Sequence, residues 1–582
     1  MWVSSLLGGG NGGAIGRRLN FEVQTFKVDH WVIEDSLATE EEARTLANKL
    51  LPNREGVRII RDFAGVPGKP ATETIIFSEM REKKGKTITV QPVEDSPVCA
   101  DTRDYLQADS RQTISKLLRQ YLEDKALTAS ELLYNAAEMK RAINFENLVP
   151  TAVGRVASIQ GKVTGQDARE RRDMIYSSLT DLRSKAEDAQ KRAGFSVKQE
   201  GFRGALEKVE ALCKGDDAEA DYLSKVILCR DLVQIRNLLG KVEWLLECAG
   251  DAAQHKAAHI HIIDTLVADA SSFPTVIQDL LGRQPDLATA LHRMLDLLEG
   301  KFEPTEREMA PPIAKVLSNW LGSGHAPQTW QVVLEGFLRS LRGTAPLARD
   351  PERNRASFAA LATRVLTPAG LFGGARMADA LTLGYLRFLE QGGGEGRRLS
   401  IEAVMGVLPT PRDRAIYLAE LAGGDVGQRE METVMARLRP LLSTDRDVNQ
   451  LVGLQVPLKP KMQAMASLYV SIVHSGLPDE VRTMLADRVD EMVASYIASS
   501  KVIERLDDPS ASLRIRATRL MQFAANDVLS SPKARKMVRD QIIGHLRQPN
   551  FDGKFVEGLN TPQEQAGALR QFYGLLRQAQ FM

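Results

Sequence analysis

The sequence predicts a mainly helical protein that begins with a small α/β module. Apolar and polar residues alternate only between about residues 21 and 93, which is typical of strands that bury one face. After about residue 104, apolar residues recur every three or four positions, as on one face of a helix. Proline and glycine interrupt these runs, as they do at helix ends.

The module is expected to follow the order strand, strand, helix, strand, strand. Alternation is clear at residues 21–26, 57–60 and 74–77, and residues 87–90 are considered as a further strand. Between the strands, Thr39 and Glu42 form a capping-box pattern, in which the hydroxyl of Thr39 accepts from the amide of Glu42. The helix that follows carries an apolar face that can cover one side of a sheet: Ala43, Leu46, Ala47, Leu50 and Leu51.

The rest of the chain is predicted to be helical throughout. Thr128 and Glu131 form a second capping-box pattern, and Pro150, Pro532 and Pro562 stand where helices are expected to start. Several glycines that follow apolar runs are interpreted as helix stops: Gly250, Gly322, Gly373, Gly392 and Gly423.

Two segments have steps of alternating four and three residues between apolar positions, which favour a long helical hairpin within the chain. The first runs from Ile175 to Ala193, and the second from Leu228 to Leu246. If the second helix extends from Ala218 to Ala249, it would be about 48 Å long at about 1.5 Å per residue.

Breaks in composition suggest how the chain is divided. Charged and proline-containing residues at 79–104 indicate a connection, and prolines near 304–312 and 457–460 mark two further boundaries. The expected units are a flexible glycine-rich extension, the α/β module, a linker and three helical domains: residues 1–18, 19–93, 94–104, 105–303, 304–458 and 459–582.

Composition excludes strongly charged classes of protein. The 582 residues include 76 basic and 75 acidic side chains, a net charge of +1, so any electrostatic partner must be bound by a local patch. The four cysteines include no Cys-x-x-Cys pair, which favours a reducing compartment. Because no signal-peptide pattern or membrane-length apolar run is visible, a cytoplasmic location is expected.

The densest histidine group is a weak candidate for a metal site. On a helix, His255 and His259 would share one face with Asp251, and imidazoles four residues apart can bind one zinc ion. The spacing alone is common on ordinary helix surfaces, so the main prediction is that no metal is bound, and no cofactor is expected.

The strongest local excess of charge lies between residues 511 and 550, with eight basic and two acidic side chains. Arg535, Lys536, Arg539 and Arg547 occupy one sector of the helix expected after Pro532, opposite Ala534, Val538, Gln541 and Ile542. These four cationic residues are the candidate partner-binding site. A solvated face is the simpler interpretation, and nucleic acid is disfavoured as a partner because no aromatic residues alternate with the charges.

Long amphipathic helices without a recognisable nucleophile motif or cofactor loop favour a non-enzymatic scaffold or adaptor. This protein would bind protein partners through its helical body and its α/β module, and its oligomeric state is left open. Two alternatives are a binder of nucleic acid or acidic surfaces through residues 511–550, and a metal-dependent helical hydrolase that uses His255 and His259.

Overall fold

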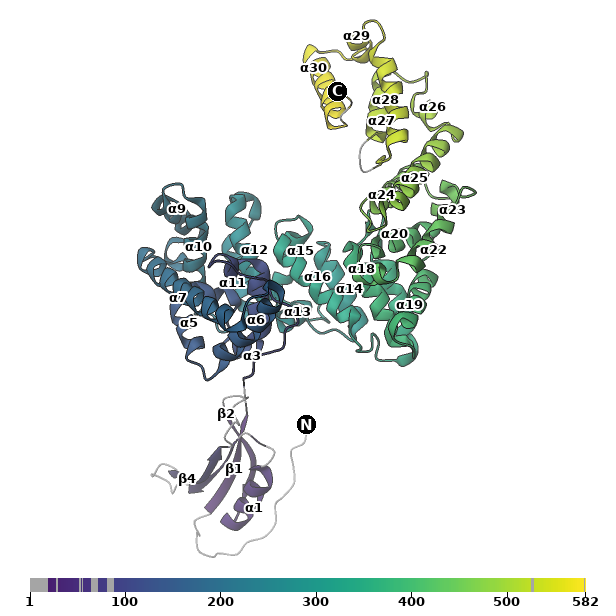
Figure 1. The fold of residues 1–582 in the computed structure, drawn as a ribbon. Coiled ribbons are helices and arrows are strands. Elements are labelled where there is room, and N and C mark those ends of the chain that lie inside the picture. The colour runs from purple at the N-terminus through teal and green to yellow at the C-terminus, as the bar shows by residue number, and fades with distance from the viewer. Residues whose placement is uncertain are drawn as a thin grey trace, which may run out of the picture. The chain divides into compact units, whose positions relative to one another are not determined.

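A computed structural model describes residues 19–27, 30–51, 54, 56–63, 72–80, 88–524, 528–579 and 581. The chain divides into two compact units, Met1–Thr89 and Val90–Met582 (Figure 1). The extension expected at residues 1–18 lies outside the described residues.

The N-terminal unit is a four-stranded antiparallel sheet with one helix. Its strands are β1 (Leu19–Lys27), β2 (His30–Leu37), β3 (Gly56–Phe63) and β4 (Thr72–Met80), in the spatial order β2-β1-β3-β4, and α1 (Glu40–Leu50) connects β2 to β3. The predicted order of strand, strand, helix, strand, strand is therefore confirmed.

The core of this unit follows from the period-two pattern. Phe21, Val23, Val57 and Ile59 lie on one sheet face and pack against two alanines of α1, Ala43 and Ala47. Small residues at these positions bring the helix close to the sheet. The Thr39 hydroxyl accepts from the amide of Glu42, as the capping-box pattern predicts. Of the further strand considered at residues 87–90, residues 88–90 are in neither helix nor strand, and residue 87 lies outside the described residues.

The second unit is a succession of helices, most of them short. Its first part contains α2 (Ala108–Leu117), α3 (Arg119–Lys125), α4 (Ala129–Tyr134), α5 (Ala136–Ile143), α6 (Leu148–Thr164), α7 (Ala168–Arg192), α8 (Val197–Glu200), α9 (Phe202–Cys213), α10 (Asp217–Leu232), α11 (Leu238–Ala249) and α12 (Ala257–Ser271). Four single 3₁₀ turns lie in the unit at Asp104–Leu106, Ala252–Gln254, Pro351–Arg353 and Leu386–Phe388.

The middle part contains α13 (Pro274–Leu281), α14 (Leu287–Leu298), α15 (Ile313–Gly322), α16 (Pro327–Arg342), α17 (Asn354–Arg364), α18 (Gly374–Tyr385), α19 (Gly393–Val407), α20 (Pro411–Leu421), α21 (Asp425–Arg429), α22 (Met431–Leu441) and α23 (Val448–Val452). The last part contains α24 (Leu458–Val473), α25 (Asp479–Ser499), α26 (Val502–Leu506), α27 (Leu513–Phe523), α28 (Pro532–Leu546), α29 (Phe551–Phe555) and α30 (Pro562–Gln578).

Contacts between helices that are not adjacent in sequence connect this unit. Helix α12 contacts α16, α16 contacts α18, α18 contacts α20, and α20 contacts α24. Each amphipathic helix thus buries its apolar face against neighbours.

Three expectations for the helical body are wrong. The helix expected from Ala218 to Ala249 is broken between α10 and α11, where the Asn237 side chain accepts from the amide of Leu239 and caps α11. A short hairpin of strands, β5 (Leu366–Thr367) and β6 (Gly370–Leu371), interrupts the helices. Finally, Gly373 and Gly392 are the N-cap residues of α18 and α19, so they begin helices instead of ending them.

Among the described residues, no single helix combines the length and apolar composition that a membrane span requires. Helices α12 and α13 meet that test only when taken together, and they are bent by 98° relative to each other.

Candidate functional site

A groove between α2 and α16 is the candidate site. It consists of two adjoining depressions of about 210 Å³ and 420 Å³ that share Gln112, Lys116, Val332 and Glu335 in their walls. Helices α3, α12, α13, α14 and α18 supply the remaining walls. We call this feature the α2–α16 groove.

The spacing of residues on α16 explains one wall. Gln328, Gln331, Val332, Glu335, Gly336, Arg339 and Ser340 line the groove, and steps of three and four residues place them on one side of the helix. The opposite side carries the buried residues Val333, Leu334, Phe337, Leu338 and Leu341. The amphipathic pattern therefore fixes which side of α16 faces the groove.

A buried aspartate of α12 positions the start of α16. The N-cap residue of α16 is Ala326, which has no side-chain acceptor, so the first amides need another partner. Asp264 accepts from the amides of Gln328 and Thr329 at 2.8 and 2.9 Å, and from the Thr329 hydroxyl at 2.7 Å. Burial raises the pKa of the Asp264 carboxyl, although these hydrogen bonds act in the opposite direction.

A buried ion pair positions α2. The Nε of Arg111 lies 3.1 Å from both carboxylate oxygens of Asp269 on α12, and both side chains are about 95% buried, with 4% and 5% exposed. Asp269 also accepts from the amide and the hydroxyl of Ser130 on α4. Burial alone would lower the pKa of Arg111, but the contact with Asp269 offsets it and the net shift is upward. The pair joins three helices at one end of the groove.

Three cations of the groove have no acidic partner. Lys116, Arg119 and Arg339 all line it, and none of them forms a salt bridge with a described residue. Glu335, which is also in the wall, pairs instead with Arg376 and with Arg342 at 3.2 Å. Because like charges repel, uncompensated cations that share a concave surface favour binding of an anionic group.

Arg119 is held firmly in this position. Its guanidinium donates to the backbone oxygen of Ser272 at 2.8 Å and lies 4.6 Å from the centre of the Phe273 ring. Burial lowers the pKa of Arg119; Glu123 acts in the opposite direction, and the charge of Arg339 adds to the lowering. The groove therefore presents a partly desolvated cation whose charge an anion would stabilise.

The groove also offers apolar surface. Ile277, Leu281, Leu287 and Met294 lie along one side of the wall. The Ser271 hydroxyl, also in the wall, is buried and has no hydrogen-bond partner among the described residues. A buried hydroxyl without a partner is unusual, but its oxygen is closed off from the groove surface.

The histidine group does not form the expected helix face. His255 lies before α12, and its Nε2 is 2.7 Å from the backbone oxygen of Ala249, whereas His259 lies within α12 and its Nε2 is 2.9 Å from Glu210. Asp251 caps the 3₁₀ turn before His255 by accepting from the amide of Ala253. Within the described ranges, no group of three or more potential metal ligands occurs.

The basic residues after Pro532 are only partly as expected. Pro532 is the first residue of α28, Ala534, Val538 and Ile542 are buried, and Lys536, Arg539 and Arg547 are exposed. Arg535 is not free, because it is half-buried and donates to the backbone oxygen of Ala579 at 2.7 Å. Gln541 is exposed instead of inward-facing, and its side chain donates to Asp507. We call the three exposed cations the α28 face.

Sequence reasoning did not identify the α2–α16 groove. Its cations come from four helices, namely α2, α3, α16 and α18, which are spread between residues 108 and 385. A polar side of a helix such as α16 resembles any solvated face, so no local pattern distinguishes it. Comparison with protein-family models, curated proteins and solved structures found no match for this chain.

Proposed function

We propose that this protein is a non-enzymatic scaffold or adaptor that binds an acidic, partly apolar segment of a partner protein in the α2–α16 groove. The observation that carries the proposal is the set of three unpaired cations, Lys116, Arg119 and Arg339, beside an apolar wall. Arginine clusters commonly bind acidic or phosphorylated motifs in this way.

The mixed character of the walls favours a peptide over a small anion. Acidic side chains of the segment would lie near Lys116 and Arg339, while apolar side chains would pack near Ile277 and Met294. Specific pockets in proteins usually combine apolar surface with a few placed polar groups. A simple anion would leave the apolar wall uncovered.

The fixed position of the cations supports affinity. Arg119 is already held by Ser272 and Phe273, and α2 and α16 are anchored to α12 by Arg111 and Asp264. Less conformational freedom is then lost on binding, which increases affinity for a given set of contacts.

Peptide display on the full chain tests this proposal. Selection from a random library should enrich Asp and Glu together with Leu, Ile or Phe, and the selected peptide is then measured by fluorescence anisotropy. The double variant Lys116→Glu, Arg339→Glu should weaken its binding at least about tenfold, which corresponds to about 1.4 kcal/mol.

A matched control is available on the α28 face. The double variant Lys536→Glu, Arg539→Glu makes the same change of net charge on exposed helix surface and should leave peptide affinity within about twofold. The proposal fails if selected peptides lack acidic residues, or if the two double variants weaken binding equally.

A further inference from the structure

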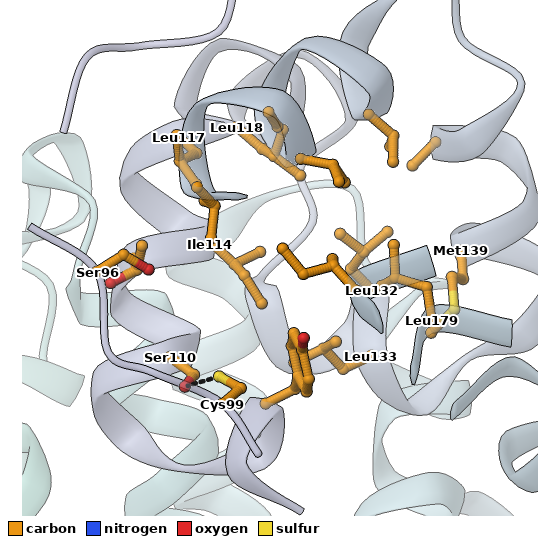
Figure 2. A pocket seen from close by; sticks show the side chains of 18 of the residues that line it. Ser96, Cys99, Ser110, Ile114, Leu117, Leu118, Leu132, Leu133, Met139 and Leu179 are labelled. Atoms are coloured by element: carbon orange, nitrogen blue, oxygen red, sulfur yellow. Dashed lines mark hydrogen bonds between the residues drawn. The ribbon is translucent and has the colours of Figure 1, made fainter. Parts of the chain in front are cut away.

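A separate apolar cavity, partly open to the surface, lies in the first part of the helical unit (Figure 2). Helices α2, α4, α5, α6 and α7 surround it, together with residues 96–99. Figure 2 shows the side chains of Ile114, Leu132, Leu133 and Leu179 around a common space, with Cys99 and Ser110 at one end. Its volume is about 100 Å³.

The polar groups in the cavity wall bond to the protein itself. The Cys99 thiol and the Ser110 hydroxyl are 3.5 Å apart, and the Thr113 hydroxyl donates to the backbone oxygen of Asp109 at 2.9 Å. The side-chain oxygen of Gln160 accepts from Arg171 at 2.6 Å, and its nitrogen donates to Ser96 and Pro97. A water molecule inside would therefore find few partners, and cavities of this kind stay dry.

Apolar side chains that line an unfilled, partly open cavity lack packing partners on that side. Protein interiors contain few voids larger than a water molecule, and atoms that line a void lose dispersion contacts on that side. An apolar cavity of roughly 150 Å³ in another protein binds benzene or xenon. A cavity of about 100 Å³ is of comparable size, since its walls are side chains that can move slightly.

We propose that this cavity binds a small apolar molecule, comparable in size to a single hydrocarbon ring. Its chemical class is set by the walls, which offer leucine, isoleucine, valine and methionine side chains and polar groups that are already bonded. Binding is non-covalent, because the buried Cys99 thiol is bonded to Ser110 and no group in the wall is positioned to attack a ligand. This inference is independent of the α2–α16 groove.

The wall at residues 96–99 suggests where the molecule enters. These residues are in neither helix nor strand, and they are held by side-chain contacts from Gln160 and by Arg171, which donates to the backbone oxygen of Cys99 at 2.9 Å. Side-chain contacts of this kind open more easily than a helix unfolds. Because the cavity is already partly open, movement of this wall would widen its mouth.

Titration of the full chain with benzene tests the proposal. Saturation-transfer NMR should show saturable binding, and the thermal unfolding midpoint should rise with benzene concentration because a ligand that binds the folded state stabilises it. Xylene, which is larger, should bind more weakly than benzene.

Two variants change the cavity in opposite directions. Ala142→Leu should fill the space and abolish benzene binding, and Ala152→Leu serves the same purpose if the first variant does not fold. Leu133→Ala should enlarge the cavity and reverse the preference, so that xylene binds at least as well as benzene.

Leu245→Ala is the matched control, since Leu245 is buried in α11 but does not line the cavity. It should lower the unfolding midpoint and keep the wild-type preference for benzene. The proposal is overturned if wild-type protein shows no saturable benzene binding, or if Ala142→Leu and Ala152→Leu both bind benzene as the wild type does.

Discussion

The helical unit carries two cationic surfaces with different origins. In the α2–α16 groove, the unpaired cations Lys116, Arg119 and Arg339 come from three helices and line a depression. On the α28 face, Lys536, Arg539 and Arg547 come from one helix and its C-cap, and all three are exposed. Charge density along a sequence therefore does not show whether the charges meet in a concave site.

The difference matters energetically. Interactions between exposed charges contribute about 0–1 kcal/mol and are weakened by salt. Lys116 and Arg339 of the groove are exposed as well, and only Arg119 is half-buried; a charge that is partly removed from water interacts more strongly, because less solvent screens it. An acidic partner is expected to gain more from the groove than from the α28 face because Arg119 is half-buried and the three cations line one depression beside apolar side chains.

The largest effect on the free energy of unfolding is expected at the buried ion pair at one end of the groove. Arg111→Ala would leave Asp269 buried without its cation, and breaking a buried pair in this way costs about 3–5 kcal/mol. Chemical denaturation of the full chain, followed by helical circular dichroism, should show this loss. Lys116→Ala, on the same helix but exposed, should change stability by less than about 0.5 kcal/mol. Equal effects of the two variants would mean that the pair does not anchor α2.

The next largest effect is expected in how peptide affinity depends on salt, which should distinguish the groove from the α28 face. Affinity of the selected acidic peptide should fall as ionic strength rises, because screening reduces its attraction to the groove. The dependence should be shallower in Lys116→Glu, Arg339→Glu and unchanged in Lys536→Glu, Arg539→Glu. A shallower dependence in the second variant alone would place the peptide on α28.

Acidification should change the stability contributed by Asp264, beside the groove, and by Asp507, beside α28, in opposite directions. Burial raises the pKa of Asp264. Its protonated form therefore adds stability to the folded protein. This stability is fully present below the ordinary Asp pKa of about 3.9 and is lost as pH rises through the raised pKa. Burial also acts to raise the pKa of Asp507, but hydrogen bonds from Arg516, Gln541 and His545 lower it overall. Its charged form adds stability above about 3.9 that is lost as pH falls through the lowered pKa.

Thermal unfolding of Asp264→Asn and Asp507→Asn between neutral pH and about pH 3 measures this contrast. As pH falls, wild-type protein should gain stability relative to Asp264→Asn and lose stability relative to Asp507→Asn. The same sign in both comparisons would show that the local contacts do not set these two pKa values.

The smallest effect is expected on the α28 face. Replacing Lys536, Arg539 and Arg547 together by Ala should change the free energy of unfolding by less than about 0.5 kcal/mol per residue, because no described residue forms a salt bridge with them. Retention on immobilised DNA or RNA at physiological salt should be absent. Strong, salt-sensitive retention that the triple variant abolishes would favour a nucleic-acid partner.

Local chemistry explains which parts of the fold could be predicted. The strands and the helix of the α/β module each follow from local residue patterns, and the caps at Thr39 and Thr128 depend on residues three positions apart; both caps are present. The break between α10 and α11 was missed because the apolar spacing continues across it, whereas the cap at Asn237 stops the helix. Gly373 illustrates another limit, since a positive φ of 77° suits the start of α18 as well as the end of a helix.

The groove could not be predicted for a different reason. Its position depends on Asp264 and Asp269, two buried residues of α12 that bind α16 and α2 across long sequence separations. In the sequence they resemble ordinary helix-surface acids. Only the tertiary packing shows that they assemble a cationic depression, while the charge cluster at residues 511–550 lies on exposed or internally bonded positions.

Photocrosslinking locates the bound segment most directly. A selected acidic peptide that carries benzophenone is bound to the full chain, irradiated and mapped by mass spectrometry. Crosslinks should concentrate at groove residues, with Met294 and Val332 foremost, and should disappear in Lys116→Glu, Arg339→Glu but persist in Lys536→Glu, Arg539→Glu. Crosslinks that concentrate on α27 or α28 and persist in the groove variant would contradict the groove as the binding surface.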